Sequence, residues 1–99
     1  MNYAIIVAAG VSLRMRGIDK TFAQVCRQPA IYWTLQTFEN HPQIGGIVLV
    51  GRSQDQQKLK ELVQKSEFKK VVSIVEGGPH RQNSVFNGLL EGQRLGWQE

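Results

Sequence analysis

Three short apolar runs, rich in β-branched residues, constrain the fold of this chain most strongly. They cover residues 3–9, 44–51 and 71–75. Each run is nearly continuous rather than alternating with polar residues, which is typical of strands that are covered on both faces. A sheet built from such strands needs a layer of helices on each side.

The segments between and after these runs have helical spacing. Residues 29–40, 53–66 and 80–95 repeat apolar side chains at helical intervals. Pro29 suits the first turn of its helix and Ser53 is a candidate N-cap. The order of strands and helices predicts an α/β fold with a parallel sheet and right-handed crossovers. The expected stripes are formed by Ile31, Leu35 and Phe38, then Leu59, Leu62 and Val63, then Val85, Leu89 and Leu90.

The chain length bounds the domain organisation. Ninety-nine residues suffice for one domain and not for two. If the first strand is central in a larger sheet, its second edge is unpaired in a chain of three strands. The chain ends with residues 92–99, just where another strand is expected. We therefore expect residues 1–99 to be the N-terminal portion of a domain that is truncated at its C-terminus.

Composition points to a globular protein in a reducing compartment. The hydrophobic content of 41% and the mixed charge differ from those of disordered chains. The single cysteine, Cys26, has no partner for an internal disulfide, which favours the cytoplasm. The apolar stretch at residues 4–9 is far too short to span a bilayer, and no basic segment precedes it. We expect a cytoplasmic protein with no membrane partner.

The net charge of +4 is concentrated in two segments. Arg14, Arg16, Lys20 and Arg27 lie between the first apolar run and the first helix. The second basic group, at residues 58–70, is interleaved with acidic residues at helical spacing and indicates a solvated helix face. No aromatic stacking platform accompanies the basic loop, so nucleic acid is not an expected partner.

The first loop combines small residues with cations. Ala8, Ala9 and Gly10 follow the first strand, and Arg14 and Lys20 follow them. Small side chains let backbone amides approach a ligand, and successive amides can cradle phosphate oxygens. The pattern is neither the P-loop nor the G-x-G-x-x-G motif. A tight turn with ordinary surface cations remains the alternative interpretation.

The second loop places two glycines before a helix. Gly77 and Gly78 permit a tight turn and close approach of a flat base, and the helix start offers free amides. Ser84, one turn into the helix, has a hydroxyl that can reach a base edge or bond back to a carbonyl. A glycine turn with a capped helix is the alternative. Both loops leave strands at the carboxyl edge of the sheet, so they can share one site.

These motifs resemble known nucleotidyltransferases. The first loop is similar to a small-small-Gly-x-x-x-Arg-Met…Lys signature that binds nucleoside triphosphates. The second resembles the cytosine-recognition segment of the 2-C-methyl-D-erythritol 4-phosphate cytidylyltransferase family, and the resemblance covers essentially all 99 residues. The seven matching residues of this segment are Gly77, Gly78, Arg81, Ser84, Val85, Gly88 and Leu89.

The resemblance implies a three-layer, mostly parallel, Rossmann-like nucleotidyltransferase fold. It also implies transfer of CMP from CTP to a sugar-alcohol phosphate with release of pyrophosphate, with Mg²⁺ as cofactor and a homodimer as the family's assembly. Arg14 and Lys20 would stabilise charge on the phosphates in the transition state. The nucleotide-binding residues implied by the family are Ala8, Ala9, Gly10, Arg14, Lys20, Gly77, Gly78, Pro79, Arg81 and Ser84.

The sequence departs from the family pattern at several points. Ser12 replaces a common glycine, Pro79 stands where members often have Asp, and Arg16 stands where small residues are frequent. The family's His-Asp-Ala-Ala-Arg strand, whose Asp holds Mg²⁺, has no match here. The cations that position methylerythritol phosphate and the dimer-forming arm also lie later in the family. We expect no metal ligand in this chain and no activity from it alone.

Four alternatives stay open at this point. The family substrate could be ribitol 5-phosphate rather than methylerythritol phosphate. A non-catalytic nucleotide-binding module fits the two loops without the metal site. A molybdopterin nucleotidyltransferase fits the first loop but gives no reason for the second. A basic nucleic-acid-binding domain fits only the charge.

Overall fold

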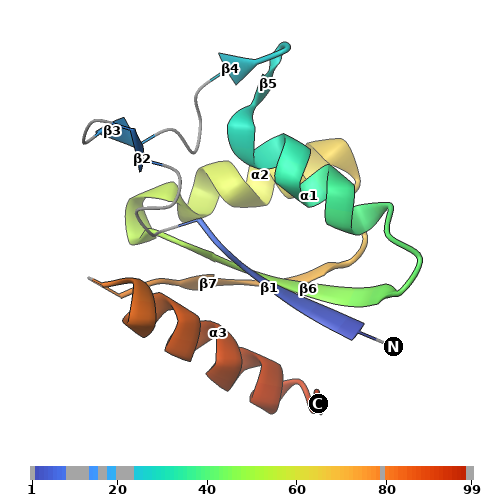
Figure 1. Ribbon diagram of the computed structural model, residues 1–99, viewed down its shortest axis with the longest axis vertical. Helices are drawn as coiled ribbons and strands as arrows, with labels where there is room; N and C mark the ends of the chain where they lie inside the picture. Colours follow the sequence, from blue (N-terminus) through green and yellow to red (C-terminus); the bar gives the residue numbers. More distant parts are fainter. Residues whose placement is uncertain (1, 9–13, 16–17, 20–23, 79, 98–99) are drawn as a thin grey trace.

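A three-stranded parallel sheet forms the centre of the molecule (Figure 1). The computed structural model describes residues 2–8, 14–15, 18–19, 24–78 and 80–97. The strands are β1 (Asn2–Val7), β6 (Ile44–Gly51) and β7 (Val71–Glu76), in the spatial order β1-β6-β7. All pairs are parallel. The three strands expected from the apolar runs are thus confirmed.

The central strand, β6, is the most buried element. Its residues Ile47, Val48, Leu49 and Val50 are all completely inaccessible to solvent. A run that is apolar on both faces can be stable only when both faces are covered, as in α/β proteins. Its uninterrupted apolar sequence therefore identifies the middle of the sheet.

In the part of the chain that the structure describes, three α-helices cover the sheet from two sides. They are α1 (Ala30–Glu39), α2 (Gln56–Ser66) and α3 (Arg81–Arg94). Figure 1 shows α1 and α2 on one face of the sheet and α3 on the other. The result is the three-layer α/β arrangement that the sequence predicts.

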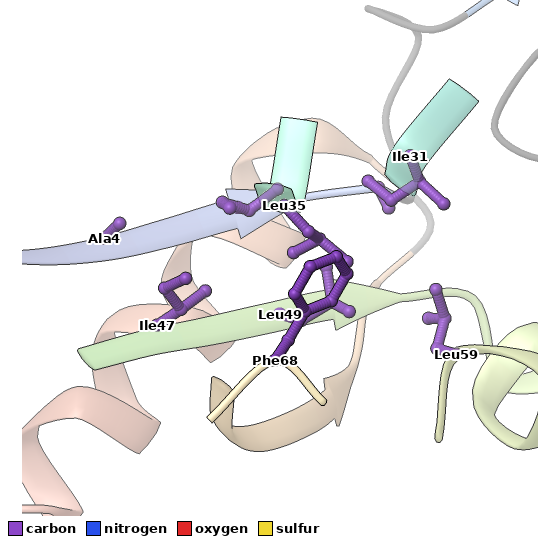
Figure 2. Packing of buried hydrophobic residues seen from close by; sticks show 9 residues of the cluster. Ala4, Ile31, Leu35, Ile47, Leu49, Leu59 and Phe68 are labelled. Carbon is purple, nitrogen blue, oxygen red and sulfur yellow. The ribbon is translucent and has the colours of Figure 1, made fainter. Parts of the chain in front are cut away.

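Large aliphatic and aromatic side chains fill the space between the sheet and the α1/α2 layer. Ile31 and Leu35 of α1 and Leu59 of α2 are fully buried there. Figure 2 shows them with Leu49 of β6 and Phe68, which follows α2. Burying a side chain of this size stabilises the fold by about 1.5–3 kcal/mol. This face therefore contributes most of the hydrophobic core.

Small residues line the opposite face. Ser84, Gly88 and Gly92 follow one another at four-residue intervals along α3 and are buried. A Cβ on Gly88 would lie 2.5 Å from the Cγ2 atom of Ile5 in β1. The stripe of Val85, Leu89 and Leu90 expected from sequence is wrong as the buried face, since Leu89 is 53% exposed and Leu90 49%. The helix approaches the sheet through its small residues instead.

Polar bonds fasten α3 to β7. Ser73 of β7 donates a hydrogen bond to the Glu91 carboxylate, and Arg94 donates to both oxygens of that carboxylate, at 2.6 and 2.7 Å. The hydrogen bonds from Arg94 and then from Ser73 lower the pKa of Glu91 to about 2. Since the carboxylate is the favoured form, the hydrogen bonds that Ser73 and Arg94 donate to it are present at neutral pH.

The segment before α2 differs from the sequence expectation. Ser53 does not cap a helix, because residues Ser53–Asp55 form the 3₁₀ turn η2 and α2 begins only at Gln56. The Asp55 carboxylate accepts a hydrogen bond from Arg52 at 2.8 Å. Pro29 immediately precedes α1, one position before the expected first turn.

Two short hairpins were not foreseen from the sequence. β2 (Arg14–Met15) pairs with β3 (Ile18–Asp19), and β4 (Gln24–Val25) pairs with β5 (Gln28–Pro29), both antiparallel. Cys26 and Arg27 form the second turn with positive φ angles of 50° and 74°. Two such residues in succession match the hairpin turns that follow strand twist.

In the described part of the chain, no helix is long and apolar enough to cross a bilayer.

Candidate functional site

The carboxyl ends of all three strands lie at one edge of the sheet. β1 runs into Ala8, whose amide donates to the Val50 carbonyl at 2.7 Å, and β7 runs into Gly77, whose amide donates to the Gly51 carbonyl at 2.9 Å. Both exits are therefore anchored to the end of β6. Because neighbouring strands lie about 4.8 Å apart, the two exits are separated by roughly 10 Å.

The turn after β7 folds tightly against the start of α3. A Cβ on Gly78 would lie 2.2 Å from the Cβ atom of Asn83, so no side chain fits at this position without movement. The Asn83 side-chain oxygen accepts a hydrogen bond from the His80 amide at 3.3 Å. The second glycine is thus required by the close approach between turn and helix.

Ser84 lies one turn into α3 and is completely buried. Its hydroxyl donates to the His80 carbonyl at 3.5 Å, and its amide donates to the same oxygen at 3.2 Å. The bond back to a carbonyl, one of the two roles considered for this hydroxyl, is the contact that the structure contains. A hydrogen bond of 3.5 Å is weak, so the hydroxyl keeps most of its capacity for another partner.

The first turn of α3 adds amide donors to this edge. Arg81 begins the helix, and the first amides of any helix lack intrahelical acceptors. The positive end of the helix dipole lies at the same place and favours anions or carbonyl oxygens. The backbone thus provides donors next to the glycine turn without any charged side chain.

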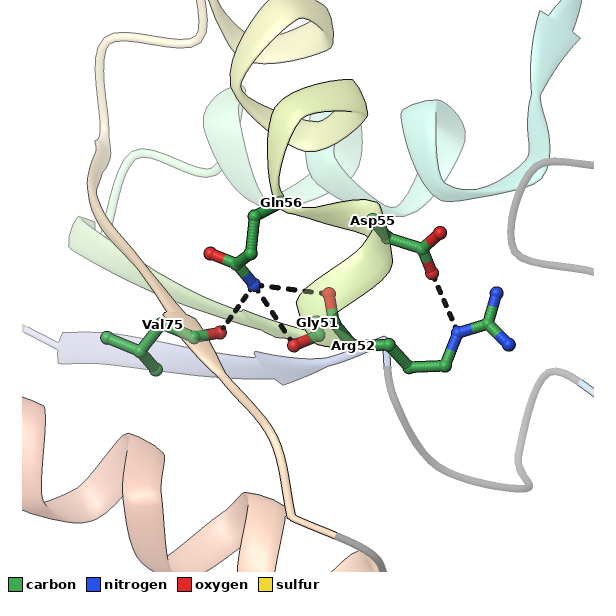
Figure 3. A network of polar contacts seen from close by, with 5 residues as sticks. All are labelled: Gly51, Arg52, Asp55, Gln56 and Val75. Carbon is green, nitrogen blue, oxygen red and sulfur yellow. Dashed lines mark hydrogen bonds and ion pairs between the residues drawn. The ribbon is translucent and has the colours of Figure 1, made fainter.

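Two amide side chains that sequence reasoning missed hold this edge together. Gln56 donates to the carbonyls of Gly51 at 3.0 Å and Val75 at 3.1 Å, and it also lies 3.4 Å from the Arg52 carbonyl (Figure 3). Asn87 donates to the Glu76 carbonyl at 3.0 Å. Both therefore position the ends of β6 and β7. Their only sequence signal is an amide residue in the helix that follows a strand, which is too common to single them out.

The acidic residues of the described part do not form a metal centre. Asp55 lies near this edge, but it is buried and its carboxylate is paired with Arg52. Among the residues that the structure describes, no group of three or more His, Cys, Asp or Glu side chains could hold a metal ion.

The residues predicted from sequence fall into three groups. Ala8, Gly77, Gly78 and Ser84 are described with their surroundings and lie at the same edge of the sheet. Arg14 and Arg81 are placed only by their backbone, in β2 and at the start of α3. Figure 1 shows the β2–β3 hairpin on the α1/α2 side of the sheet, opposite α3. The predicted residues outside the described part are Ala9, Gly10, Lys20 and Pro79.

Residues 2–94 match the family described as 2-C-methyl-D-erythritol 4-phosphate cytidylyltransferase. A curated relative bearing that name, from Dehalococcoides mccartyi strain 195, is 45% identical over 94 residues. The match covers 95% of this chain and 41% of the relative. A relative of the same name from Clostridium kluyveri is 44% identical, with 89% of this chain and 39% of the relative covered.

A solved structure agrees with these sequence matches. The crystal structure of 4-diphosphocytidyl-2C-methyl-D-erythritolsynthase from Anaerococcus prevotii superimposes with a TM-score of 0.71 at 31% identity. The superposition covers 89% of this chain and 36% of that protein. The chain thus has a nucleotidyltransferase fold, and it spans about two fifths of the length of the proteins that it matches.

Proposed function

Because the chain belongs to the 2-C-methyl-D-erythritol 4-phosphate cytidylyltransferase family, we propose that it supplies the CTP-binding part of such an enzyme. The reaction would transfer CMP from CTP to 2-C-methyl-D-erythritol 4-phosphate and release pyrophosphate. The observation that carries this proposal is the shared edge at which Ala8 and the glycine turn, Gly77 and Gly78, flank the end of β6. Residues 1–99 would then be the N-terminal, nucleotide-binding portion of the domain.

The glycine turn and α3 would hold the cytosine. The absence of a side chain at Gly78 lets the turn lie against Asn83, and the buried Ser84 hydroxyl makes only a weak 3.5 Å hydrogen bond to the His80 carbonyl. Pro79 and Arg81 would border the same base, as the resemblance implies. Base recognition would depend on the close packing of the turn against Asn83, since this packing fixes where the amides of the turn point.

The segment after β1 would hold the triphosphate. The amides of Ala8, Ala9 and Gly10 would approach the phosphate oxygens, and Arg14 and Lys20 would add positive charge. The β2 hairpin carries Arg14 on the α1/α2 side of the sheet, whereas α3 lies on the other side. A nucleotide bound here would therefore lie across the end of the sheet.

The chemistry requires no covalent enzyme intermediate. A phosphate oxygen of the acceptor attacks the α-phosphorus of CTP and forms a new P–O bond. The bond from this phosphorus to the bridging oxygen breaks, and pyrophosphate leaves with the electron pair. Arg14 and Lys20 would stabilise the charge that develops on the equatorial and leaving oxygens. Cys26, an exposed free thiol, has no role in this scheme.

The family's Mg²⁺ would need ligands from elsewhere. When bound, a divalent ion supplies neutralisation of phosphate charge. Among the described residues, no group of three or more His, Cys, Asp or Glu side chains lies together to hold such an ion. The acceptor-binding cations and the family's homodimer contacts would likewise come from the part that this chain does not match.

Pyrophosphate release tests the proposal directly. The 99-residue chain should bind CTP weakly and release no pyrophosphate. A longer chain, in which it is joined to the remainder of the Dehalococcoides mccartyi relative, should release pyrophosphate from CTP with methylerythritol phosphate and not with ribitol 5-phosphate. Calorimetric titration of the 99-residue chain should detect binding of CTP and no binding of ATP. Equal binding of both nucleotides, or of neither, contradicts the cytidine assignment.

A non-catalytic nucleotide-binding module is the second candidate. This candidate needs only the shared edge at which Ala8 and the glycine turn flank the end of β6. In that case the longer chain would bind CTP as tightly as the proposed enzyme but would release no pyrophosphate with either acceptor.

A further inference from the structure

We propose that Arg52, held by the buried carboxylate of Asp55, is a further nucleotide-binding residue and contacts the triphosphate of the bound nucleotide. This inference rests on the proposed function, because it assigns one more side chain to the same edge of the sheet. Neither residue is among those that the family resemblance implies. Asp55 would be a positioning residue, since it would act only through the Arg52 guanidinium.

Arg52 lies at the end of the central strand. It directly follows Gly51, the last residue of β6. The exits of β1 and β7 flank this strand end, because the Ala8 amide donates to Val50 and the Gly77 amide donates to Gly51. Since neighbouring strands lie about 4.8 Å apart, a ligand that reaches both exits must pass over the end of β6. Arg52 is therefore placed at the middle of the shared edge.

Hydrogen bonds on two sides fix the backbone of Arg52. The Gln56 side-chain amide lies 3.4 Å from the Arg52 carbonyl and donates to the carbonyls of Gly51 and Val75 (Figure 3). The Asp55 amide donates to the Arg52 carbonyl at 2.9 Å, which closes the η2 turn. The point from which the Arg52 side chain extends is thus defined by both β7 and η2.

The Asp55 carboxylate orients the guanidinium. Its Oδ2 atom accepts a hydrogen bond from the Arg52 Nε atom at 2.8 Å. The Asp55 side chain is 5% exposed and the Arg52 side chain 31%, so the pair is less screened than a surface ion pair and still borders the solvent. A guanidinium carries five N–H groups in a planar fork, so it can bond a carboxylate and a phosphate at the same time.

The direction of the side chain favours the triphosphate over the base. Figure 3 shows the Arg52 side chain and Val75 on opposite sides of Gly51. Val75 belongs to β7, and β1 lies on the other side of β6. The guanidinium is therefore directed towards the exit of β1, where the triphosphate would bind, and away from the glycine turn, where the cytosine would bind.

A second arginine–carboxylate pair provides a matched control. Arg94 and Glu91 have the same i,i+3 spacing, with a distance of 2.6 Å from Nε to the carboxylate. Arg94 ends α3, whereas the glycine turn precedes its first residue. A helix of 14 residues is about 20 Å long, so Arg94 lies far from the strand exits. Loss of Arg94 breaks the same kind of pair without touching the site.

Titration of the isotopically labelled 99-residue chain with CTP and with cytidine, followed by amide chemical shifts, tests the assignment. Arg52→Gln should weaken CTP binding at least tenfold, as expected for loss of a charge-assisted hydrogen bond. The weaker binding of cytidine, which has no phosphate, should be unchanged. Arg52→Lys should give an intermediate CTP affinity, because it keeps the charge and loses the fork. Arg94→Gln should leave CTP binding unchanged.

A double variant separates binding from folding. Arg52→Gln alone leaves the buried Asp55 carboxylate without this partner, which is destabilising. Arg52→Gln combined with Asp55→Asn removes that charge and should restore the unfolding temperature without restoring CTP affinity. Recovery of CTP affinity in the double variant would show that the unpaired carboxylate caused the loss, and would overturn the proposal.

Asp55 is tested through the same two ligands. Asp55→Asn keeps an oxygen that can accept from the Arg52 Nε atom and should retain most of the CTP affinity. Asp55→Ala should weaken CTP binding and leave cytidine binding unchanged. If Asp55→Ala weakens both ligands alike, its role is structural and Asp55 does not position the guanidinium.

The remaining outcomes distinguish this inference from the proposed function. If the unaltered chain binds CTP and Arg52→Gln binds it equally well, the inference fails and the proposed function stands. Equal losses of CTP and cytidine in Arg52→Gln would place the guanidinium at the nucleoside and contradict the assignment to the triphosphate. An equal loss in Arg94→Gln would contradict it as well. If the unaltered chain binds no CTP, the proposed function fails, and the inference fails with it.

Discussion

The two faces of the sheet are stabilised in different ways. On the α1/α2 face, fully buried residues such as Ile31, Leu35 and Leu59 fill a conventional hydrophobic core. On the α3 face, Gly88 brings the helix backbone close to Ile5, and polar bonds to β7 secure it. The stability of the α1/α2 face thus depends on large buried side chains. The stability of the α3 face depends on small residues that let the helix approach the sheet.

The difference matters for the candidate site. α3 carries the turn that would contact the base, and the close approach at Gly78 fixes this turn relative to the strand ends. Close packing through glycine allows little adjustment, so the position of the α3 N-terminus is well defined. The same arrangement leaves Phe86 and Leu89 half exposed. The N-terminus of α3 is thus held in a defined position, whereas the Phe86 and Leu89 side chains of the same helix remain half uncovered.

The largest expected effect is loss of volume on the α1/α2 face. Leu49→Ala removes a fully buried side chain from β6 and should lower the free energy of unfolding by about 2–5 kcal/mol. Urea denaturation followed by circular dichroism measures this change. Leu90→Ala, at a half-exposed position of α3, should cost no more than about 0.5 kcal/mol. Similar losses in the two variants would remove the distinction between the faces.

Added volume on the α3 face should be the next largest effect. Gly88→Ala places a Cβ 2.5 Å from the Ile5 Cγ2 atom and should lower the free energy of unfolding by about 1–3 kcal/mol. An exposed glycine in a helix would instead gain about 1 kcal/mol from alanine. Ile5→Ala in the Gly88→Ala background should recover part of the loss, since it removes the clashing atom. Stabilisation by Gly88→Ala alone would show that the helix does not pack closely.

The amide that joins the strand ends should have a smaller effect on stability. Gln56→Leu leaves the Gly51 and Val75 carbonyls without this donor and should cost about 1–2 kcal/mol. CTP binding should also weaken, because the exit of β7 is anchored to Gly51. Gln57→Leu alters the neighbouring, exposed amide of the same helix and serves as the control. If the two variants bind CTP equally, Gln56 does not position the site.

The smallest effect at neutral pH concerns the polar fastening of α3. The pKa of Glu91 is lowered from 4.5 to about 2, so the stability that its carboxylate contributes is complete above pH 4.5. It should be lost as the pH falls from about 4.5 to about 2. For Glu91→Gln, the midpoint temperature of thermal unfolding should therefore fall less steeply over this pH interval than it does for the unaltered chain. Arg94→Gln removes the main cause of the lowered Glu91 pKa. In this variant the fall in the unfolding midpoint should begin at a higher pH. If the pH dependence of the unfolding midpoint is unchanged in both variants, the Glu91 carboxylate does not contribute to stability in this way.

Much of the fold could be predicted because hydrophobic burial leaves a clear pattern. The continuous run of β6 identifies the central strand, and the helices begin and end within a few residues of their predicted limits. The buried face of α3 could not be predicted in this way. Packing through Ser84, Gly88 and Gly92 has no hydrophobic periodicity, so the sequence pattern points to the exposed Leu89 and Leu90 instead.

The candidate site was predictable in part. The spacing of Gly77 and Gly78 after a strand identifies the turn, because only glycine tolerates the approach of Asn83. Gln56 and Asn87 could not be identified, since their partners are backbone carbonyls of residues distant in sequence. The roles of Arg14 and Lys20 remain predictions, as the structure does not describe their side chains.

A titration of the isotopically labelled chain with CTP, followed by amide chemical shifts, tests the central claim most directly. The claim is that the exits of β1 and β7 bind one nucleotide together. The amides of Ala8, Gly77 and Gly78 should shift along a single saturation curve, and ATP should not reproduce the changes. Shifts confined to one exit, or separate saturation curves at Ala8 and Gly77, would show that the two turns do not share a ligand.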